Sequence, residues 1–172
     1  MSEPVMGWAV CRPRAARRVA MLATALSLLG ALSTPALATG DTSSAQPVFA
    51  IESPKAAKGL MIDVVHAGKR LVAVGDRGHI LYSDDQGNTW TQAKVPTRQL
   101  LTAVYFVDDK HGWAVGHDAQ ILASTDGGAT WAQQYQDLKR EAPLLDVWFK
   151  DAEHGLAVGA YGALIETTDG GK

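Results

Sequence analysis

Cysteine and an excess of basic charge are both missing from most of this sequence. The single cysteine is Cys11, so the chain beyond residue 38 offers no disulfide, no cysteine-ligated zinc site and no thiol nucleophile. Residues 39–172 carry 12 Lys and Arg against 17 Asp and Glu, a net charge of −5. An acidic chain with no basic run interleaved with aromatic residues is not expected to bind nucleic acid.

Long apolar runs are missing as well. The longest, residues 19–32, has 14 residues, whereas a membrane-spanning helix needs about 20. Four arginines precede this run, and the small-x-small sequence Ala36-Leu37-Ala38 follows it. This order is typical of an export signal, so we predict that residues 1–38 are a signal peptide and that no stable membrane span remains after cleavage. Arg17-Arg18 leaves the secretory and twin-arginine routes open, and a retained anchor is the weaker alternative.

An internal repeat is what the sequence does contain. Residues 83–90, Ser-Asp-Asp-Gln-Gly-Asn-Thr-Trp, return at 124–131 as Ser-Thr-Asp-Gly-Gly-Ala-Thr-Trp and begin again at 167–172 as Thr-Thr-Asp-Gly-Gly-Lys. A second marker, Ala-Val-Gly, lies about ten residues ahead of each copy, and both markers recur after 41 and then 43 residues. A period of about 40–45 residues indicates the four-stranded blade of a β-propeller.

Each copy has the composition of a tight turn. A hydroxyl residue is followed two positions later by Asp and two positions after that by Gly, and Thr-Trp closes the complete copies. Hydroxyl and carboxylate oxygens accept backbone N–H groups, glycine supplies positive φ, and tryptophan is a large apolar anchor. Because only one box Asp falls in each blade, the box aspartates would lie far apart around a ring, so we expect a structural role and no catalytic or metal site. The residues of this turn are Ser83, Asp85, Gly87, Trp90, Ser124, Asp126, Gly128, Trp131, Thr167, Asp169 and Gly171.

The repeat predicts an all-β propeller of four-stranded blades. About two and a half blades of an expected six or seven are present, so we expect the sequence to be the N-terminal part of a longer protein; blades that close a ring by self-association are the alternative. The three blades are predicted at 59–97, 98–141 and 142–172, the last incomplete, after a linker at 39–58 that holds a candidate ring-closing strand. Each innermost strand is almost continuously apolar, which indicates coverage on both faces. Trp113 and Trp148 are expected in the core.

The turns between the second and third strands are the best candidates for partner contacts. Their lengths match while their middle residues vary, as in a face of exchangeable binding residues. Plain solvated hairpins remain the alternative. The candidate residues are Asp76, Arg77, His117, Asp118 and Tyr161.

The histidines do not indicate a metal site. His111 and His154 occupy equivalent positions ahead of the second strands, and recurrence once per blade favours a structural turn. The remaining histidines show no ligand spacing, so we expect no metal and no cofactor.

The repeat resembles the Asp-box, or BNR repeat, of β-propellers. Residues 100–106 and 111–116, followed by the box at 124–131, look like the blade of the photosystem II stability/assembly factor family. That resemblance implies an exported, non-enzymatic propeller without a cofactor. Its partner would be a protein, a subunit of a membrane complex contacted on the exported side, which the propeller helps to assemble. The compartment would be the periplasm, or the thylakoid lumen in a photosynthetic host.

Two other classes of protein share the same box. A sialidase-like glycoside hydrolase needs an arginine cluster, a Tyr/Glu nucleophile pair and an Asp acid, and the Phe-Arg-Ile-Pro signature is missing here. A glycan-binding module is the second alternative. Members of the assembly-factor family that bind the photosystem use a basic patch, whereas the arginines after residue 38 are scattered in the sequence. They are Arg70, Arg77, Arg98 and Arg140.

Overall fold

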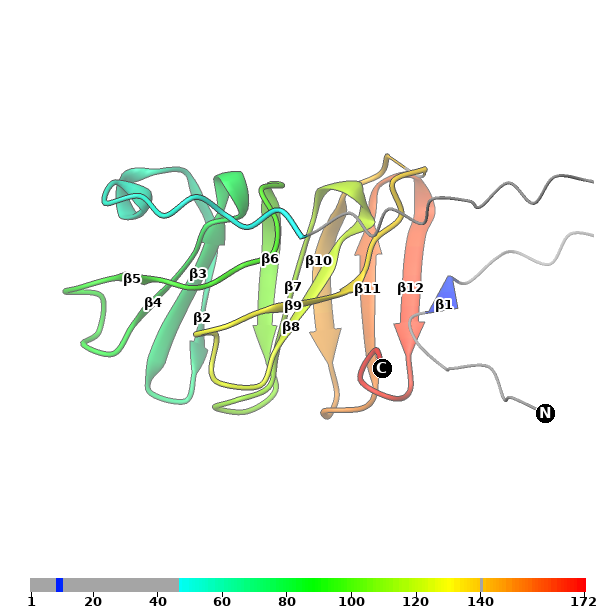
Figure 1. Cartoon of the computed structure of the whole chain (residues 1–172). Coiled ribbons are helices and arrows are strands. Elements are labelled where there is room, and N and C mark those ends of the chain that lie inside the picture. The colour runs from blue at the N-terminus through cyan, green and yellow to red at the C-terminus, as the bar shows by residue number, and fades with distance from the viewer. Residues whose placement is uncertain (1–8, 11–46, 140) are drawn as a thin grey trace, which may run out of the picture. The chain divides into compact units, whose positions relative to one another are not determined.

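Three antiparallel sheets, each of four strands, make up the structure, a computed structural model that describes residues 9–10, 47–139 and 141–172. All of these residues belong to one compact unit. The predicted all-β fold is confirmed, and the sheets follow one another in chain order (Figure 1).

Each sheet contains a meander of consecutive strands that begins at its innermost strand. The first sheet holds β2 (Met61–Ala67), β3 (Arg70–Gly75), β4 (Ile80–Ser83) and β5 (Thr91–Gln92). The second holds β6 (Leu101–Phe106), β7 (Gly112–Gly116), β8 (Ile121–Ser124) and β9 (Ala132–Tyr135). The third holds β10 (Leu144–Phe149), β11 (Gly155–Gly159) and β12 (Ala163–Thr167), with β1 (Ala9–Val10) at its edge. Short 3-10 turns are η1 (Ala56–Lys58), η2 (Asp76–Gly78), η3 (His117–Ala119) and η4 (Ala160–Gly162).

The edge strand β1 comes from the predicted signal peptide. Ala9 pairs with Glu166 and Val10 with Ile165, so β1 takes the edge that β5 and β9 take in the other sheets. The other residues of the predicted signal peptide, and linker residues 39–46, lie outside the described residues, so the signal peptide stays a prediction. Among the residues described, no helix has the length and apolar character to cross a membrane.

The sheets pack on one another through opposite faces. We call the face that contacts the next sheet in the chain the forward face, and the face that contacts the preceding sheet the rear face. At the first interface, Val72 and Ile80 on the forward face of the first sheet join one apolar cluster with Val104 and Leu122 on the rear face of the second. All four of these side chains are buried, so the burial of apolar surface holds these two sheets together.

The second interface repeats this arrangement with larger side chains. Trp113 on the forward face of the second sheet stacks on Phe149 of the third, with ring centroids 3.4 Å apart and planes at 8°. Val115 and Ile121 join the same cluster as Val147 and other residues of the third sheet. Trp113 therefore lies in the core, as predicted.

Two faces are left uncovered by any sheet of the described chain. On β2 the side chain of Val64 is 55% exposed, because the rear face of the first sheet has no neighbouring sheet there. On β10 the side chains of Leu145 and Trp148 are 53% and 48% exposed on the third sheet. The expectation that every innermost strand is covered on both faces is therefore wrong for these two strands, and Trp148 is not a core residue.

The glycine of each Ala-Val-Gly marker lies against the start of the innermost strand. A register shift between the first and third residues of β6 brings the Leu100 carbonyl over Gly116, where an added Cβ would lie 2.2 Å from that oxygen. Gly75 and Gly159 meet the Leu60 and Pro143 carbonyls at 2.1 and 2.3 Å in the same way. The glycine recurs because no side chain fits there.

Residues 47–53 run along the outer part of the first blade. The Ala50 N–H donates to the Val95 carbonyl over 2.9 Å. The Gln92 side chain donates to the Ile51 carbonyl and accepts from the Ser53 N–H, both at 3.0 Å. This segment forms no strand in the described sheets, and the ring-closing strand predicted within it stays a prediction.

Candidate functional site

The boxes form a recurring network of short hydrogen bonds. In the second box the Gly128 N–H donates to Ser124 Oγ over 2.9 Å, and the Ser124 hydroxyl donates to Asp126 Oδ1 over 2.9 Å. Thr130 donates to the same carboxylate through its N–H at 2.9 Å and its hydroxyl at 2.6 Å. The first box repeats all four bonds, and the third repeats the first two through Thr167, Asp169 and Gly171. The box side chains thus bond to their own turns.

The two box tryptophans have different surroundings. Trp131 is 6% exposed between the first two sheets, donates from Nε1 to the Gly128 carbonyl over 2.9 Å, and meets Phe106 edge to face at 6.0 Å between ring centroids. Trp90 is half-buried and lines an apolar cavity of about 270 Å³ on the rear face of the first sheet. The same residue type therefore anchors an interface in one blade and borders an uncovered face in another.

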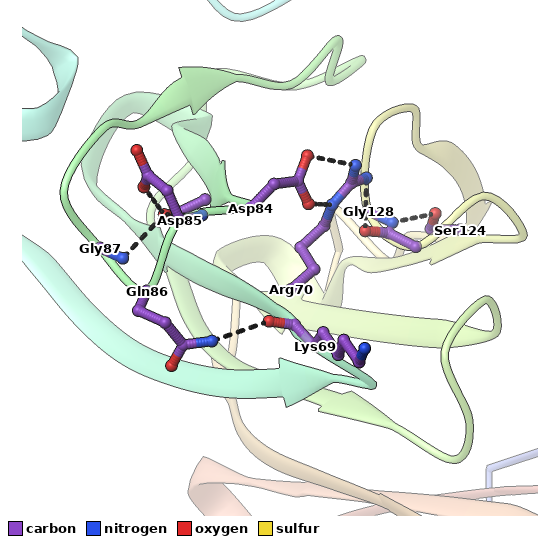
Figure 2. A network of polar contacts seen from close by, with 10 residues as sticks. Lys69, Arg70, Asp84, Asp85, Gln86, Gly87, Ser124 and Gly128 are labelled. Atoms are coloured by element: carbon purple, nitrogen blue, oxygen red, sulfur yellow. Dashed lines mark hydrogen bonds and ion pairs between the residues drawn. The ribbon is translucent and has the colours of Figure 1, made fainter.

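Arg70 connects the first two boxes. Its guanidinium forms a bidentate ion pair with Asp84, at 2.7 and 2.8 Å, and Nη1 donates to the Gly127 carbonyl of the second box over 3.3 Å (Figure 2). The Arg70 guanidinium also lies 4.3 Å from the centre of the Tyr82 ring. The hydrogen bond with Asp84 raises the pKa of Arg70 and lowers that of Asp84. The Arg70 guanidinium is thus occupied by Asp84 and the Gly127 carbonyl, so it joins two blades and is not free to hold a ligand.

The recurring histidines lie in turns that an aspartate caps. Asp108 accepts the N–H groups of Lys110 and His111, each over 2.7 Å, and contacts the His111 ring at 2.8 Å. Asp151 does the same for Glu153 and His154 in the third blade. Across the described residues, no group of three or more His, Cys, Asp or Glu side chains is placed to hold a metal ion.

Acid should weaken these turns in a defined pH window. Bonds from Thr89 and then Ser83 lower the pKa of Asp85 to about 2, and the His154 and Glu153 N–H groups lower that of Asp151 to about 2. Burial raises the pKa of Asp108, but its bonds to His111 and Lys110 outweigh burial and bring it to about 2.

We therefore expect the unfolding temperature to be level from pH 7 to about pH 5 and to fall between about pH 4 and pH 2. In that window the unfolded carboxylates bind protons that the folded ones do not, so lowering the pH favours unfolding. Thermal melts followed by circular dichroism would measure this fall. An unfolding temperature that stays level down to pH 2 would contradict the prediction.

The predicted partner-contact residues lie on three equivalent turns at one end of the sheets. The turns η2, η3 and η4 each follow a second strand, and each donates an N–H to the carbonyl that precedes an innermost strand. In every turn the middle residue has a left-handed backbone, with φ of 56° at Arg77, 58° at Asp118 and 56° at Tyr161. Figure 1 shows these turns at the same end as the segment that holds η1.

The turns present these side chains separately. Arg77 Nε lies 3.5 Å from Asp76 Oδ2, Asp118 accepts from the Gln99 side chain over 2.6 Å, and Tyr161 is 89% exposed. His117 is exposed. Within the part of the chain that the structure describes, no hydrogen bond or ion pair joins side chains of different turns.

A small basic cavity adjoins the first of these turns. Its volume is about 260 Å³, and its lining comes from the linker, from η2 and the residue that follows it, and from the connection to the second blade. Arg98 Nε donates to the Phe49 carbonyl over 2.8 Å, which fixes that guanidinium at the cavity. Two arginines, a histidine and one carboxylate are among the lining residues. The lining residues are Ile51, Glu52, Ser53, Arg77, His79 and Arg98.

Sequence reasoning missed this grouping. It selected Arg77 but treated the arginines as scattered, because Arg77 and Arg98 belong to different blades of the repeat. Both arginines line one cavity because the backbone of Thr97 and Arg98 passes directly over Gly78, and residues 51–53 complete the lining. The one signal in the sequence was the apolar segment around Phe49, which stood out from a polar linker. Arg140 lies outside the described residues.

Comparisons with known proteins agree with the repeat. Residues 83–141 match the sequence model of a family described as photosynthesis system II assembly factor YCF48. A solved structure described as YCF48 bound to D1 peptide aligns at 21% identity and a TM-score of 0.55, over 63% of this chain and 36% of that chain. YCF48 from Cyanidioschyzon merolae aligns at 18% identity and a TM-score of 0.35, over 63% of this chain and 51% of that chain. No curated protein matches.

These matches confirm the resemblance over part of the chain. The family match takes in the first box and the second blade with its complete box. The likeness to the first solved structure shows the fold, that of a segment of a YCF48 propeller. The chain spans between a third and about half of the length of the two solved chains.

Proposed function

We propose that this chain forms blades of an exported, non-enzymatic β-propeller that binds a protein segment of a membrane-associated complex and helps to assemble that complex. The observation that carries the proposal is the match of residues 83–141 to an assembly-factor family. In a photosynthetic host the complex would be photosystem II and the compartment the thylakoid lumen; in other bacteria the compartment would be the periplasm.

The basic cavity offers a point of contact for such a segment. A guanidinium binds a carboxylate through paired, charge-assisted hydrogen bonds, and Arg98 is already oriented by its bond to Phe49. The volume of about 260 Å³ suits one or two side chains of a partner better than a whole small-molecule substrate. A related protein has been solved with a bound peptide, which supports a peptide ligand here.

The non-enzymatic part of the proposal rests on the geometry of the carboxylates. The box aspartates bond to their own turns, one in each blade, and Glu52 is the only carboxylate that lines the basic cavity. Most glycoside hydrolases place two carboxyl groups within about 5–10 Å of each other on either side of the scissile bond. Neither the boxes nor the cavity present such a pair.

Arginine substitutions at the cavity should weaken partner capture. In the full-length protein we expect Arg98→Gln to reduce the affinity for the partner about tenfold or more, since one charge-assisted contact contributes about 1.5–3 kcal/mol. Arg77→Asn removes the second guanidinium at a left-handed position that asparagine tolerates, so its fold is retained. Affinity purification from the native host, with the bound membrane subunits quantified by mass spectrometry, would measure the effect.

A charge-matched control comes from the opposite end of the sheets. Lys150→Gln removes one exposed positive charge next to the turn that Asp151 caps, away from the cavity. We expect capture by this variant to equal that of the unmodified protein. If the Arg98→Gln and Arg77→Asn variants capture as much partner as Lys150→Gln, the cavity is not the point of contact with the partner.

A further inference from the structure

The outer edge of the first blade holds a segment of the chain's own linker by its backbone. The Gln92 side chain donates to the Ile51 carbonyl and accepts the Ser53 N–H, both at 3.0 Å. In an extended segment these two groups, one on either side of a single residue, point to the same side. One side-chain amide therefore bonds the segment as a neighbouring strand would.

Two further hydrogen bonds hold the same segment. The Val95 carbonyl accepts the Ala50 N–H over 2.9 Å, and Arg98 Nε donates to the Phe49 carbonyl over 2.8 Å. Four backbone groups of the segment are thus bonded to the first blade, and none of these four bonds uses a side chain of the segment. Recognition through the backbone requires an extended segment but tolerates many sequences.

Gln133 occupies the position of Gln92 in the second blade. Strand register shows this, since each glutamine pairs with the second residue of the third strand in its own sheet. Lys139 follows Gln133 by six residues, as Arg98 follows Gln92. Residues 133–139 line a cavity of about 540 Å³. The second blade therefore repeats the amide and the cation of the linker site beside an open cavity.

Gln133 retains one hydrogen-bond donor and one acceptor. Its Oε1 accepts from the Gln120 side chain over 3.1 Å, and its Nε2 donates to Gln136 Oε1 over 3.2 Å. A carboxamide has two N–H hydrogens and two acceptor lone pairs. Within the described part of the chain, one of each on Gln133 has no partner. These are the two kinds of group that Gln92 gives to the linker.

The outer edge of the second blade is also more open than that of the first. Gln133 and Lys139 are exposed, and the Leu138 side chain is 63% exposed. On the first blade, Ala93 and Val95 are buried. An occupant that places an apolar side chain against Leu138 would remove this surface from water, which stabilises the bound state.

We propose that residues 133–139 bind an extended segment of the protein partner through its backbone, as the first blade binds residues 49–53. Gln133 donates to a carbonyl of that segment and accepts the N–H two residues further on. Lys139 donates to a carbonyl nearer the N-terminus of the segment, and an apolar side chain covers Leu138. The inference rests on the proposed function only for the protein that supplies the segment, and it adds a second point of contact to the basic cavity.

The chain's own linker does not compete for this edge. Residues 49–53 are held at the first blade, and their attachment to the same chain gives them an effective concentration there of about millimolar. A second copy of the chain is disfavoured for the same reason, because its linker is held on its own first blade. The occupant is therefore a separate segment.

A synthetic peptide tests the site in the full-length protein. The probe has the sequence of residues 47–53 with both ends blocked, and the protein carries ¹⁵N in its glutamine side chains. We expect the side-chain resonance of Gln133, identified by its loss in Gln133→Glu, to shift with half-saturation at about 1 mM or below, while that of Gln92 stays in place. A probe with N-methylserine at the position of Ser53 lacks the N–H that Gln133 accepts. It should bind about fivefold more weakly, the effect of one hydrogen bond.

Three results overturn the inference. They are an unmoved Gln133 resonance, a shift confined to Gln92, which marks exchange with the linker at the first blade, and equal binding of the two probes.

A second measurement needs no variant and keeps the test decisive if Gln133→Glu fails to fold. A probe with benzoylphenylalanine at the position of Phe49 should cross-link on illumination within residues 133–139, as mapped by mass spectrometry. Cross-links confined to residues 92–98, or none, overturn the inference. Neither readout involves the membrane partner, whereas the capture assay with the cavity arginines does, so the inference and the proposed function fail separately.

Discussion

Alanine in place of Gly116 is expected to lower the free energy of unfolding by about 3 kcal/mol or more, which corresponds to a fall of about 6–12 °C in the unfolding temperature. The added Cβ would lie 2.2 Å from the Leu100 carbonyl oxygen and 3.0 Å from the Leu101 Cα. Both are backbone atoms at the start of an innermost strand, so relief requires that strand to move within a close-packed core. Thermal and urea unfolding of the purified variant would measure the loss.

Gly162→Ala is the matched control for this substitution. Gly162 lies a few residues from the equivalent glycine of the third blade, has φ of 71°, and has no atom within 4 Å of an added Cβ. Only the left-handed backbone opposes alanine there, at a cost of about 1 kcal/mol. If the two variants lose equal stability, close approach of the backbone is not the reason that glycine recurs in the marker.

Removal of the Trp131 side chain is expected to be as severe. Trp131→Ala should destabilise the protein by about 3–5 kcal/mol, the usual cost of deleting a buried aromatic side chain. The residue is 6% exposed, contacts Phe106 edge to face and donates to the Gly128 carbonyl, so both packing and a buried hydrogen bond are lost. Chemical denaturation followed by circular dichroism gives the free energy directly.

Trp131→Phe separates the two contributions. Phenylalanine keeps most of the apolar surface but leaves the Gly128 carbonyl without the Nε1 donor, so we expect a loss of about 1–2 kcal/mol. A Trp131→Ala variant that is no less stable than Trp131→Phe would show that the ring does not hold the first two sheets together.

The repeat made the fold predictable from the sequence. Two markers with one period predicted four-stranded blades that follow one another along the chain, and the structure has three four-stranded sheets in that order. The positions of Gly116 and its equivalents were evident from the marker, but their reason was not. The close approach to the Leu100 carbonyl depends on a register shift in the innermost strand, which leaves no trace in the spacing of the markers.

The candidate binding cavity was beyond prediction for a related reason. A repeat pattern describes contacts that recur from blade to blade, whereas the bond from Arg98 to Phe49, a residue ahead of the repeats, occurs only at the first blade. The exposure of Trp148 has the same origin. An apolar residue in a strand is predicted to be buried. It is buried only if another sheet packs on its face, and the spacing of the repeat does not show whether that sheet is there.

The two kinds of face also bear on the order in which the chain acquires structure during synthesis. Each sheet buries its rear face on the sheet made before it and leaves its forward face open, so every completed blade is a template for the one that follows. We therefore expect the sheets to form one after another, from the N-terminus onward. At each stage the nascent chain exposes the apolar forward face of its newest sheet, in addition to the rear face of the first, and that forward face is prone to aggregation until about 40 more residues of the repeat are made.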